Sequence, residues 1–368
     1  LLIEGDLVLS ANSTLNLSNN SCNLEIRGNI TYNGTNDAIT EGNGTVNFNG
    51  NGVQEFNSTS ASESFYNLIV SADSGQVQLG TDVDIINDLT LDSGSSSKLV
   101  LGNNDLSISN NGSIIGGNEN EFIVTNGSGF VNQERLGPGG RTGAILFPVG
   151  PTTNRYNPVL INNSGSRDDY RVRAIDRMYS SGSSGAVVNR YAINTSWLIE
   201  EATAGGSNVE ITLQWNAVEE LADFDNTDCF VYHYTGGSWL QEQLNDAATG
   251  SGPYTRTVSG ITSFSPFGVG SGPGIGGALP IELGSFKAQP NNESVLLQWN
   301  TITEINNDFF TIERSADAIN FEVIGTIAGA GNSTVQQFYS FTDDDPLKGT
   351  TYYRLKQTDY DGRFEYFG

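Results

Sequence analysis

Short runs of alternating apolar and polar residues fill about the first 130 positions of the chain. Each run carries two apolar residues one position apart, and Gly, Asn and Ser separate the runs. Because successive side chains of a strand point to opposite faces, such a pair turns both apolar groups to one face. The pairs are Leu7/Leu9, Leu15/Leu17, Leu24/Ile26, Val46/Phe48, Leu68/Val70, Val77/Leu79, Val83/Ile85, Leu89/Leu91, Leu99/Leu101 and Leu106/Ile108.

The short strands that these pairs predict recur roughly every eight to ten residues. A strand so short cannot bury its apolar face alone, so it must stack on copies of itself, as the coils of a β-solenoid do. The alternative is a meandering sandwich of hairpins. The turns vary in length and rarely show a two-residue Asn-Gly loop, which favours the solenoid. We therefore expect residues 1–134 to form a β-solenoid resembling a right-handed β-helix.

The pattern changes over residues 135–270, where the strands lengthen and arginines become frequent. The segment "YHYTGGSWL" predicts a hairpin with Gly236 and Gly237 at its turn. We interpret this region as an antiparallel β-sandwich. Residues 271–280 are rich in Gly and Pro and have no apolar face, which predicts a flexible linker.

The last region, residues 281–368, contains six or seven predicted strands in under ninety residues. A tryptophan early in the region and a tyrosine pair late in it are typical of an immunoglobulin-like sandwich. Trp299 is the expected core residue, and Tyr352 or Tyr353 stands where such folds place a corner tyrosine. The whole chain is therefore predicted to be all-β.

Charge narrows the set of partners. The formal net charge is −25, and no basic cluster is present to neutralise phosphates. This balance argues against nucleic acid and against anionic membrane surfaces as partners. The simplest role of the acidity is to keep a β-rich protein in solution.

The two cysteines indicate whether the chain has a disulfide, and its first residues indicate whether it was processed. Cys22 and Cys229 lie far apart, in regions expected to fold separately, so we predict two free thiols rather than a disulfide. The sequence opens at "LLIEGDLVLS", inside a strand pattern, and lacks a signal peptide or an apolar run of membrane-spanning length. We expect it to be an internal piece of a longer, processed polypeptide.

Catalytic groups are sparse. His233 is the single histidine, and Asp228 lies near it, but no GxSxG motif supplies a nucleophile. A histidine on a sheet face beside aromatic residues is the simpler interpretation. The adjacent carboxylates Glu200/Glu201 and Glu219/Glu220 would point to opposite faces of a strand, unlike the facing pair of a glycosidase. We expect a protein without enzymatic activity and without a cofactor.

One segment carries a metal hypothesis. "ADFDNTD" places Asp223, Asp225, Asn226 and Asp228 within one turn, and hard cations take such clustered oxygen ligands. Asp223, Asp225 and Asp228 are therefore candidate calcium ligands, with solvated loop charge as the alternative. Trp239 lies beside the Gly-Gly turn and is the candidate for an exposed aromatic that binds a ligand such as a glycan.

The last ninety residues carry a resemblance to a known family. "LPIELGSFKAQPNNESVLLQWNTITEINNDFFTIERSADAINFEVIG" and "YSFTDDDPLKGTTYYRLKQTDYDGRFEY" resemble the fibronectin type III-like module common in secreted proteins of Bacteroidota. "FPVGPTTNRYNPVLI" and "WLIEEATAGGSNVEITLQWNA" are similar to the sandwich that often precedes it. "GNGTVNFNGNGVQEF" is similar to the repeat region of such surface proteins. In those proteins the module usually precedes a C-terminal sorting domain. No such domain follows the module in this sequence, and we expect that it was cleaved after export or was not part of this chain.

This resemblance implies export by the type IX secretion system, with that machinery as a partner during export, and an extracellular or cell-surface location. Together with the solenoid pattern it suggests a structural or adhesive surface protein that binds a glycan or protein ligand or associates with itself. The alternative is the non-catalytic, carbohydrate-targeting portion of a large secreted hydrolase.

Overall fold

The computed structural model describes residues 1–18, 22–34, 39–40, 42–72, 75–91, 94, 96–242, 246–271, 283–302, 304–333, 335–359 and 364–367. These residues are almost entirely strands and turns, and their single helical segment is the 3-10 turn Ala217–Glu219. The all-β prediction is confirmed. The chain divides into an N-terminal unit, Leu1–Gly237 with Gln241–Ser271, and a C-terminal unit, Ser238–Leu240 with Gly272–Gly368.

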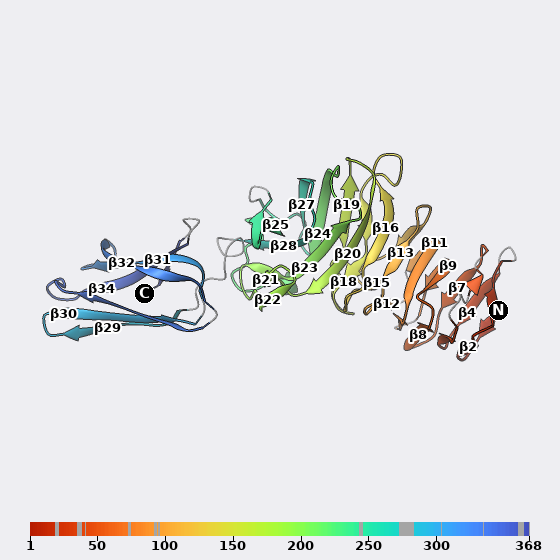
Figure 1. Ribbon diagram of the computed structural model, residues 1–368, viewed down its shortest axis with the longest axis horizontal. Helices are drawn as coiled ribbons and strands as arrows, with labels where there is room; N and C mark the ends of the chain where they lie inside the picture. The colour runs from red at the N-terminus through yellow and green to blue at the C-terminus, as the bar shows by residue number, and fades with distance from the viewer. Residues whose placement is uncertain are drawn as a thin grey trace. The chain divides into compact units, whose positions relative to one another are not determined.

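The first part of the N-terminal unit is a β-solenoid of stacked coils, as the paired pattern predicted (Figure 1). One parallel ladder contains β1 (Leu2–Ile3), β4 (Asn23–Ile26), β7 (Thr45–Phe48), β9 (Ser62–Val70), β11 (Asp82–Leu91), β13 (Leu106–Ile108) and β16 (Val131–Leu136). The second contains β2 (Leu7–Leu9), β5 (Ile30–Tyr32), β8 (Val53–Ser58), β10 (Gln76–Leu79), β12 (Lys98–Val100), β15 (Phe122–Val124) and β18 (Val149–Gly150). Two minor strands, β3 (Leu15–Asn16) and β6 (Ile39–Thr40), also pair in parallel.

Each coil repeats after 20 to 26 residues, which is the offset between paired strands. Val46 lies opposite Leu68, for example, and Ile85 lies opposite Ile108. Strands of the two parallel ladders alternate along the chain, and together they form a solenoid of about six turns. Because the offset varies from coil to coil, the repeat has no fixed sequence period and shows itself in the apolar pairs instead.

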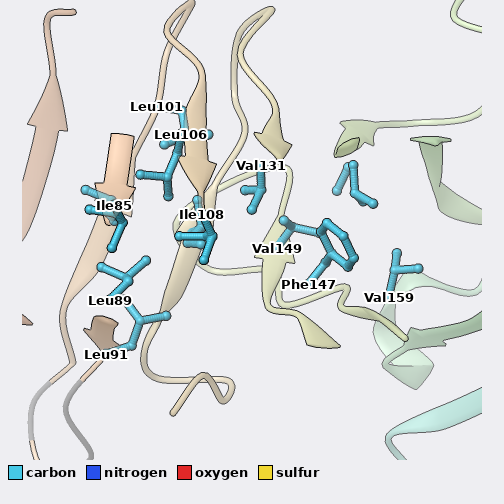
Figure 2. Close-up of a cluster of buried hydrophobic side chains, with 14 of the residues drawn as sticks. Ile85, Leu89, Leu91, Leu101, Leu106, Ile108, Val131, Phe147, Val149 and Val159 are labelled. Carbon is cyan, nitrogen blue, oxygen red and sulfur yellow. The ribbon is translucent and has the colours of Figure 1, made fainter. Parts of the chain in front are cut away.

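A continuous hydrophobic core fills the coils (Figure 2). Every predicted pair from Leu24/Ile26 onward is buried, whereas Leu7, Leu9 and Leu15 of the first coil are partly buried against the same cluster. Burying one such side chain contributes about 1.5–3 kcal/mol. The apolar pairs therefore account for the folding of these coils.

Side chains at the start of the strands tie one coil to the next. The backbone N–H of Asp105 donates to Oδ1 of Asp82 at 2.9 Å, and that of Phe130 donates to Oδ1 of Asp105 at 2.8 Å. On the other ladder Asn29 N–H donates to Asp6 Oδ1 at 2.8 Å. Asn29 Oδ1 in turn accepts from the N–H of Glu55 at 2.8 Å. These interactions form an Asp/Asn ladder that satisfies backbone donors at the turns.

The same sheet continues into the second part of the N-terminal unit, where the pairing becomes antiparallel. After β16 come β20 (Asp168–Asp176), β23 (Ala192–Glu201), β28 (Pro266–Ser271) and β25 (Cys229–Thr235). A separate antiparallel sheet contains β17 (Ile145–Phe147), β19 (Val159–Asn163), β24 (Val209–Trp215) and β27 (Tyr254–Ile261). Of the remaining strands, β14 (Ser113–Gly116) pairs in parallel with β11 of the solenoid, and β21 (Tyr179–Ser181) pairs antiparallel with β22 (Ser184–Val187).

Residues 1–134 and 135–270 were expected to be separate regions, and this expectation is corrected. One core cluster extends from Leu17 to Val269, and one sheet runs through both regions. The pattern change near residue 135 marks the switch from parallel pairing of β13 with β16 to antiparallel pairing of β16 with β20. It is a change of strand direction within one compact unit.

The C-terminal unit contains two antiparallel sheets. One contains β29 (Leu283–Asn291), β30 (Ser294–Thr301) and β33 (Gln337–Asp343), and the other contains β32 (Glu322–Ser333), β31 (Glu304–Ser315), β34 (Tyr352–Asp359) and β35 (Phe364–Phe367). Trp299 is only 2% exposed and contacts the rings of Phe310 and Tyr339, so the predicted core residue is confirmed. Apart from Ser271, which ends β28, the predicted linker 271–280 lies outside the described residues.

The buried carboxylate of Glu304 stabilises the C-terminal unit. Glu304 accepts hydrogen bonds from the side chains of Thr301, Asn307 and Tyr339 and from the backbone N–H of Ala330. Burial opposes ionisation, but the hydrogen bonds outweigh it and hold the pKa of Glu304 below its usual value. Tyr353, one of the two candidates for the corner tyrosine, donates instead to the carboxylate of Asp343 at 2.9 Å.

Candidate functional site

An open groove of about 420 Å³ lies over the sheet where the solenoid meets the antiparallel strands. Its floor is a row of residues opposite one another on β13, β16, β20 and β23. Ser107 lies opposite Asn132, Asn132 opposite Arg171, and Arg171 opposite Glu200. Because residues in register on adjacent strands share a face, four polar side chains point outward together. We call this set the polar row.

The polar row is already ordered by contacts within the protein. Asn132 donates to Ser107 Oγ at 3.3 Å, and Arg171 Nε donates to Glu200 Oε2 at 2.5 Å. The guanidinium of Arg171 also lies 4.5 Å from the ring centre of Phe130, which adds a cation–π contact. A site whose groups are held in place before binding loses less entropy when a ligand arrives.

Further carboxylates line the groove, and each has a local structural role. Glu134 accepts from the backbone N–H of Asn110, and Asp169 accepts from that of Arg135. Glu201 accepts from Ser207 Oγ and from the N–H of Gly205, and so fixes the loop after β23. These hydrogen bonds orient the carboxylates along the groove.

A second open groove of about 510 Å³ adjoins the first and shares Glu200 and Glu201 with it. Its other side includes Phe264 and Pro266 beside Ser263 and Ser265. Phe264 packs edge-on against Tyr170, whose ring is buried. The two grooves together offer hydroxyl, amide, carboxylate and guanidinium groups on a rigid sheet, which suits a ligand rich in hydroxyl groups. Sequence analysis missed this row because its members come from strands far apart in the chain.

The three candidate calcium ligands do not form a metal site in the described part of the chain, which contains no close group of three or more His, Cys, Asp or Glu side chains. Asp223 has φ of 59° and forms an ion pair with Arg190 at 2.8 Å. Asp225 accepts from the N–H and Oγ1 of Thr227, and these bonds lower its pKa. The short segment thus uses its oxygens to close a turn, as Asp and Asn commonly do. Asp228 also interacts with another group of the protein.

His233 is a buried residue of the sheet, as the simpler interpretation expected. Its ring stacks on Phe267 with 4.3 Å between ring centres, and Nδ1 lies 2.7 Å from Glu242 Oε1. Asp228 is not the carboxylate that contacts it. Within the described residues His233 Nε2 has no hydrogen-bond partner, so no serine nucleophile is joined to the imidazole as a catalytic triad requires.

The expectation of an exposed Trp239 is corrected. Trp239 lies on β26 (Ser238–Gln241) and is 3% exposed, whereas its neighbours Ser238 and Leu240 are exposed. Alternation along the strand turns the indole inward and its neighbours outward. Cys22 and Cys229 are both free, as predicted.

Comparisons with known proteins place few limits on function. No protein-family model matches the sequence, and no curated protein matches it. One solved structure is similar in part, a β-1,2-glucanase from Parabacteroides distasonis. It is 12% identical, the match covers 50% of this chain and 32% of that chain, and the TM-score is 0.17. The chain therefore spans about a third of the glucanase. Within the described residues, no helix has the length and apolar character needed to cross a membrane.

Proposed function

We propose that this chain is a structural or adhesive part of a secreted, non-enzymatic bacterial surface protein. The observation that carries the proposal is the solenoid, in which one core and one Asp/Asn ladder pass from coil to coil. Such stacking builds an extended surface from short strands and places no demand on catalytic groups. The sequence resemblance supports a fibronectin type III-like fold for the C-terminal unit and export by the type IX secretion system.

Localisation tests this proposal directly. Antibodies raised against the chain are expected to label intact cells of the source bacterium, and labelling should fall to background when the type IX translocon is disrupted. Purified protein coated on beads is expected to retain cells or extracellular matrix, compared with beads coated with an unrelated acidic β-protein. Protein confined to the cytoplasm in wild-type cells would contradict the proposal.

A second candidate is the carbohydrate-targeting part of a secreted hydrolase, and the polar row favours it. Polar side chains fixed on a sheet beside an open groove resemble the requirements of sugar binding. A glycan array tests this candidate with Arg171→Ala, which should abolish binding, and with Arg167→Ala as the matched control. Arg167 donates to Gly139 O away from the residues that line the groove. No bound glycan, or equal binding by both variants, would remove this candidate.

A further inference from the structure

The C-terminal unit carries cations and aromatic rings together on the outer face of one sheet. Arg354 and Lys356 lie two residues apart on β34, so they share a face, while Leu355 between them is buried in the core. Tyr366 lies opposite Lys356 on β35, and Phe364 lies opposite Thr358. We call Phe321, Arg354, Lys356, Phe364 and Tyr366 the aromatic–cation ladder.

Arg354 is held between two rings. Its guanidinium carbon lies 3.8 Å from the ring centre of Phe321 and 4.1 Å from that of Tyr366. Its Nε donates to Glu313 at 2.7 Å, while 31% of the side chain stays exposed. The guanidinium is ion-paired with Glu313 and fixed between the two rings, so it orders the surface on which Lys356 lies.

Lys356 has no such carboxylate. Its Nζ lies 3.9 Å from the ring centre of Phe364, and no carboxylate of the described residues lies within ion-pair distance of it. Phe364 is 52% exposed and Tyr366 is 43% exposed. Because cations already cover faces of these rings, a sugar could not stack on those faces. The ladder is therefore better suited to an anionic partner.

The same chain supplies an anionic surface of the required kind. Residues 1–134 contain 16 Asp and Glu residues, whereas Arg27 and Lys98 are their only cations. On β11, Asp82 and Asp84 alternate with the buried Val83 and therefore share the outer face. Neither aspartate has a cation within ion-pair distance among the described residues. Burial, opposed by a hydrogen bond with Ser107 and reinforced by the charge of Asp82, raises the pKa of Asp84.

We propose that the aromatic–cation ladder of one copy docks on the acidic outer face of β11 in a second copy. Charge complementarity between the two surfaces selects this partner, and the exposed rings add apolar contact. The two surfaces are different, so the contact is heterologous and extends into open chains unless it closes into a ring. The inference deepens the proposed structural function and rests on it.

Charge reversal in the full chain tests the docking by sedimentation velocity over a range of protein concentrations at low and high NaCl. The wild type should associate as concentration rises, and more weakly at high salt. Lys356→Glu should weaken association about 10-fold or more, because like charges then face each other. Asp84→Lys should do the same. Lys287→Glu is the matched control, because Lys287 is an exposed lysine of the other sheet, and it should leave association unchanged.

An equimolar mixture of Lys356→Glu and Asp84→Lys should associate again, since each variant supplies the surface that the other lacks. A wild type that stays monomeric at every concentration and salt level would overturn the proposal, as would equal effects of Lys356→Glu and Lys287→Glu. Binding to an anionic polysaccharide that is lost in Lys356→Glu, without self-association, would also overturn it and would assign the ladder to that ligand. Surface labelling tests the proposed function independently, so the two can fail separately.

Discussion

Individual polar residues in this chain mostly stabilise the fold. The burial of each side chain determines how it responds to thiol reagents or to pH. Cys229 is fully buried, and burial raises the pKa of its thiol to about 11, despite the opposing charge of Arg256. Cys22 is half-buried. The two thiols differ in access, although the sequence alone made them equivalent.

This difference predicts selective labelling. A thiol reagent at pH 8 should modify Cys22 and leave Cys229 unmodified in the native protein, because only a thiolate that solvent can reach reacts quickly. Mass spectrometry of the labelled peptides measures the outcome, and denatured protein, in which both should react, is the control. Rapid native labelling of Cys229 would show that β25 opens.

Glu304 gives a prediction that depends on pH. Its pKa in the folded state is lowered, so its stabilising contribution is present above the pKa of the unfolded state, near 4.5, and is lost as pH falls through the folded value. Glu304→Gln should lower the free energy of unfolding at pH 7 by about 1–3 kcal/mol, since hydrogen bonds to a buried charged group are lost.

Below about pH 4 the gap between wild type and Glu304→Gln should narrow, because the wild-type carboxyl is then protonated too. Calorimetry across this pH range measures the effect. Glu293→Gln is the matched control, since Glu293 is exposed on the turn after β29. A gap that stays constant from pH 7 to pH 3 would contradict the assigned role of the carboxylate.

At the scale of elements, the apolar pairs were sufficient to predict the coils, because burial on one face is a local property of alternation. The Asp/Asn ladder was not predicted. Asp82 and Asp105 are separated by 23 residues along the chain, and their contact exists only once the coils are stacked. The polar row was missed for the same reason, because register between distant strands decides which side chains meet.

The Asp/Asn ladder predicts a smaller loss of stability than the core beside it. Asp105→Ala removes an acceptor from the N–H of Phe130, and should lower the free energy of unfolding by about 1 kcal/mol. Leu106→Ala, one residue later, leaves a cavity in the core and should cost about 2–5 kcal/mol. Urea unfolding measures both. Glu119→Ala, at an exposed turn residue, should cost little; a loss equal to that of Asp105→Ala would argue against the ladder.

At the scale of the whole molecule, composition and pattern identified three regions, whereas the structure has two units. Long-range pairing of β16 with β20 merges the first two regions, and a local pattern contains no information about which strand follows another across a sheet. The division between the two units falls after Ser271, next to the Gly/Pro-rich segment, and such a composition is itself a local signal.

Two units with separate cores predict two unfolding transitions. Leu89→Ala in the solenoid and Trp197→Phe in the antiparallel part should shift the same transition, since both residues belong to one core. Trp299→Phe should shift the other. Differential scanning calorimetry of the full chain measures this. Separate transitions for Leu89→Ala and Trp197→Phe would show that the solenoid and the antiparallel strands fold independently.

The antiparallel strands follow the last coil of the stack at β16, and this has a consequence for how the length of the solenoid can change. Insertion or deletion of one whole coil, 20 to 26 residues, preserves the alignment of every apolar pair and leaves β20 and β23 untouched. Each coil changes the reach of the solenoid by about 4.8 Å, the spacing of neighbouring strands. Length is thus a trait that gene duplication can adjust in small steps, while the terminal unit and its surface chemistry stay the same.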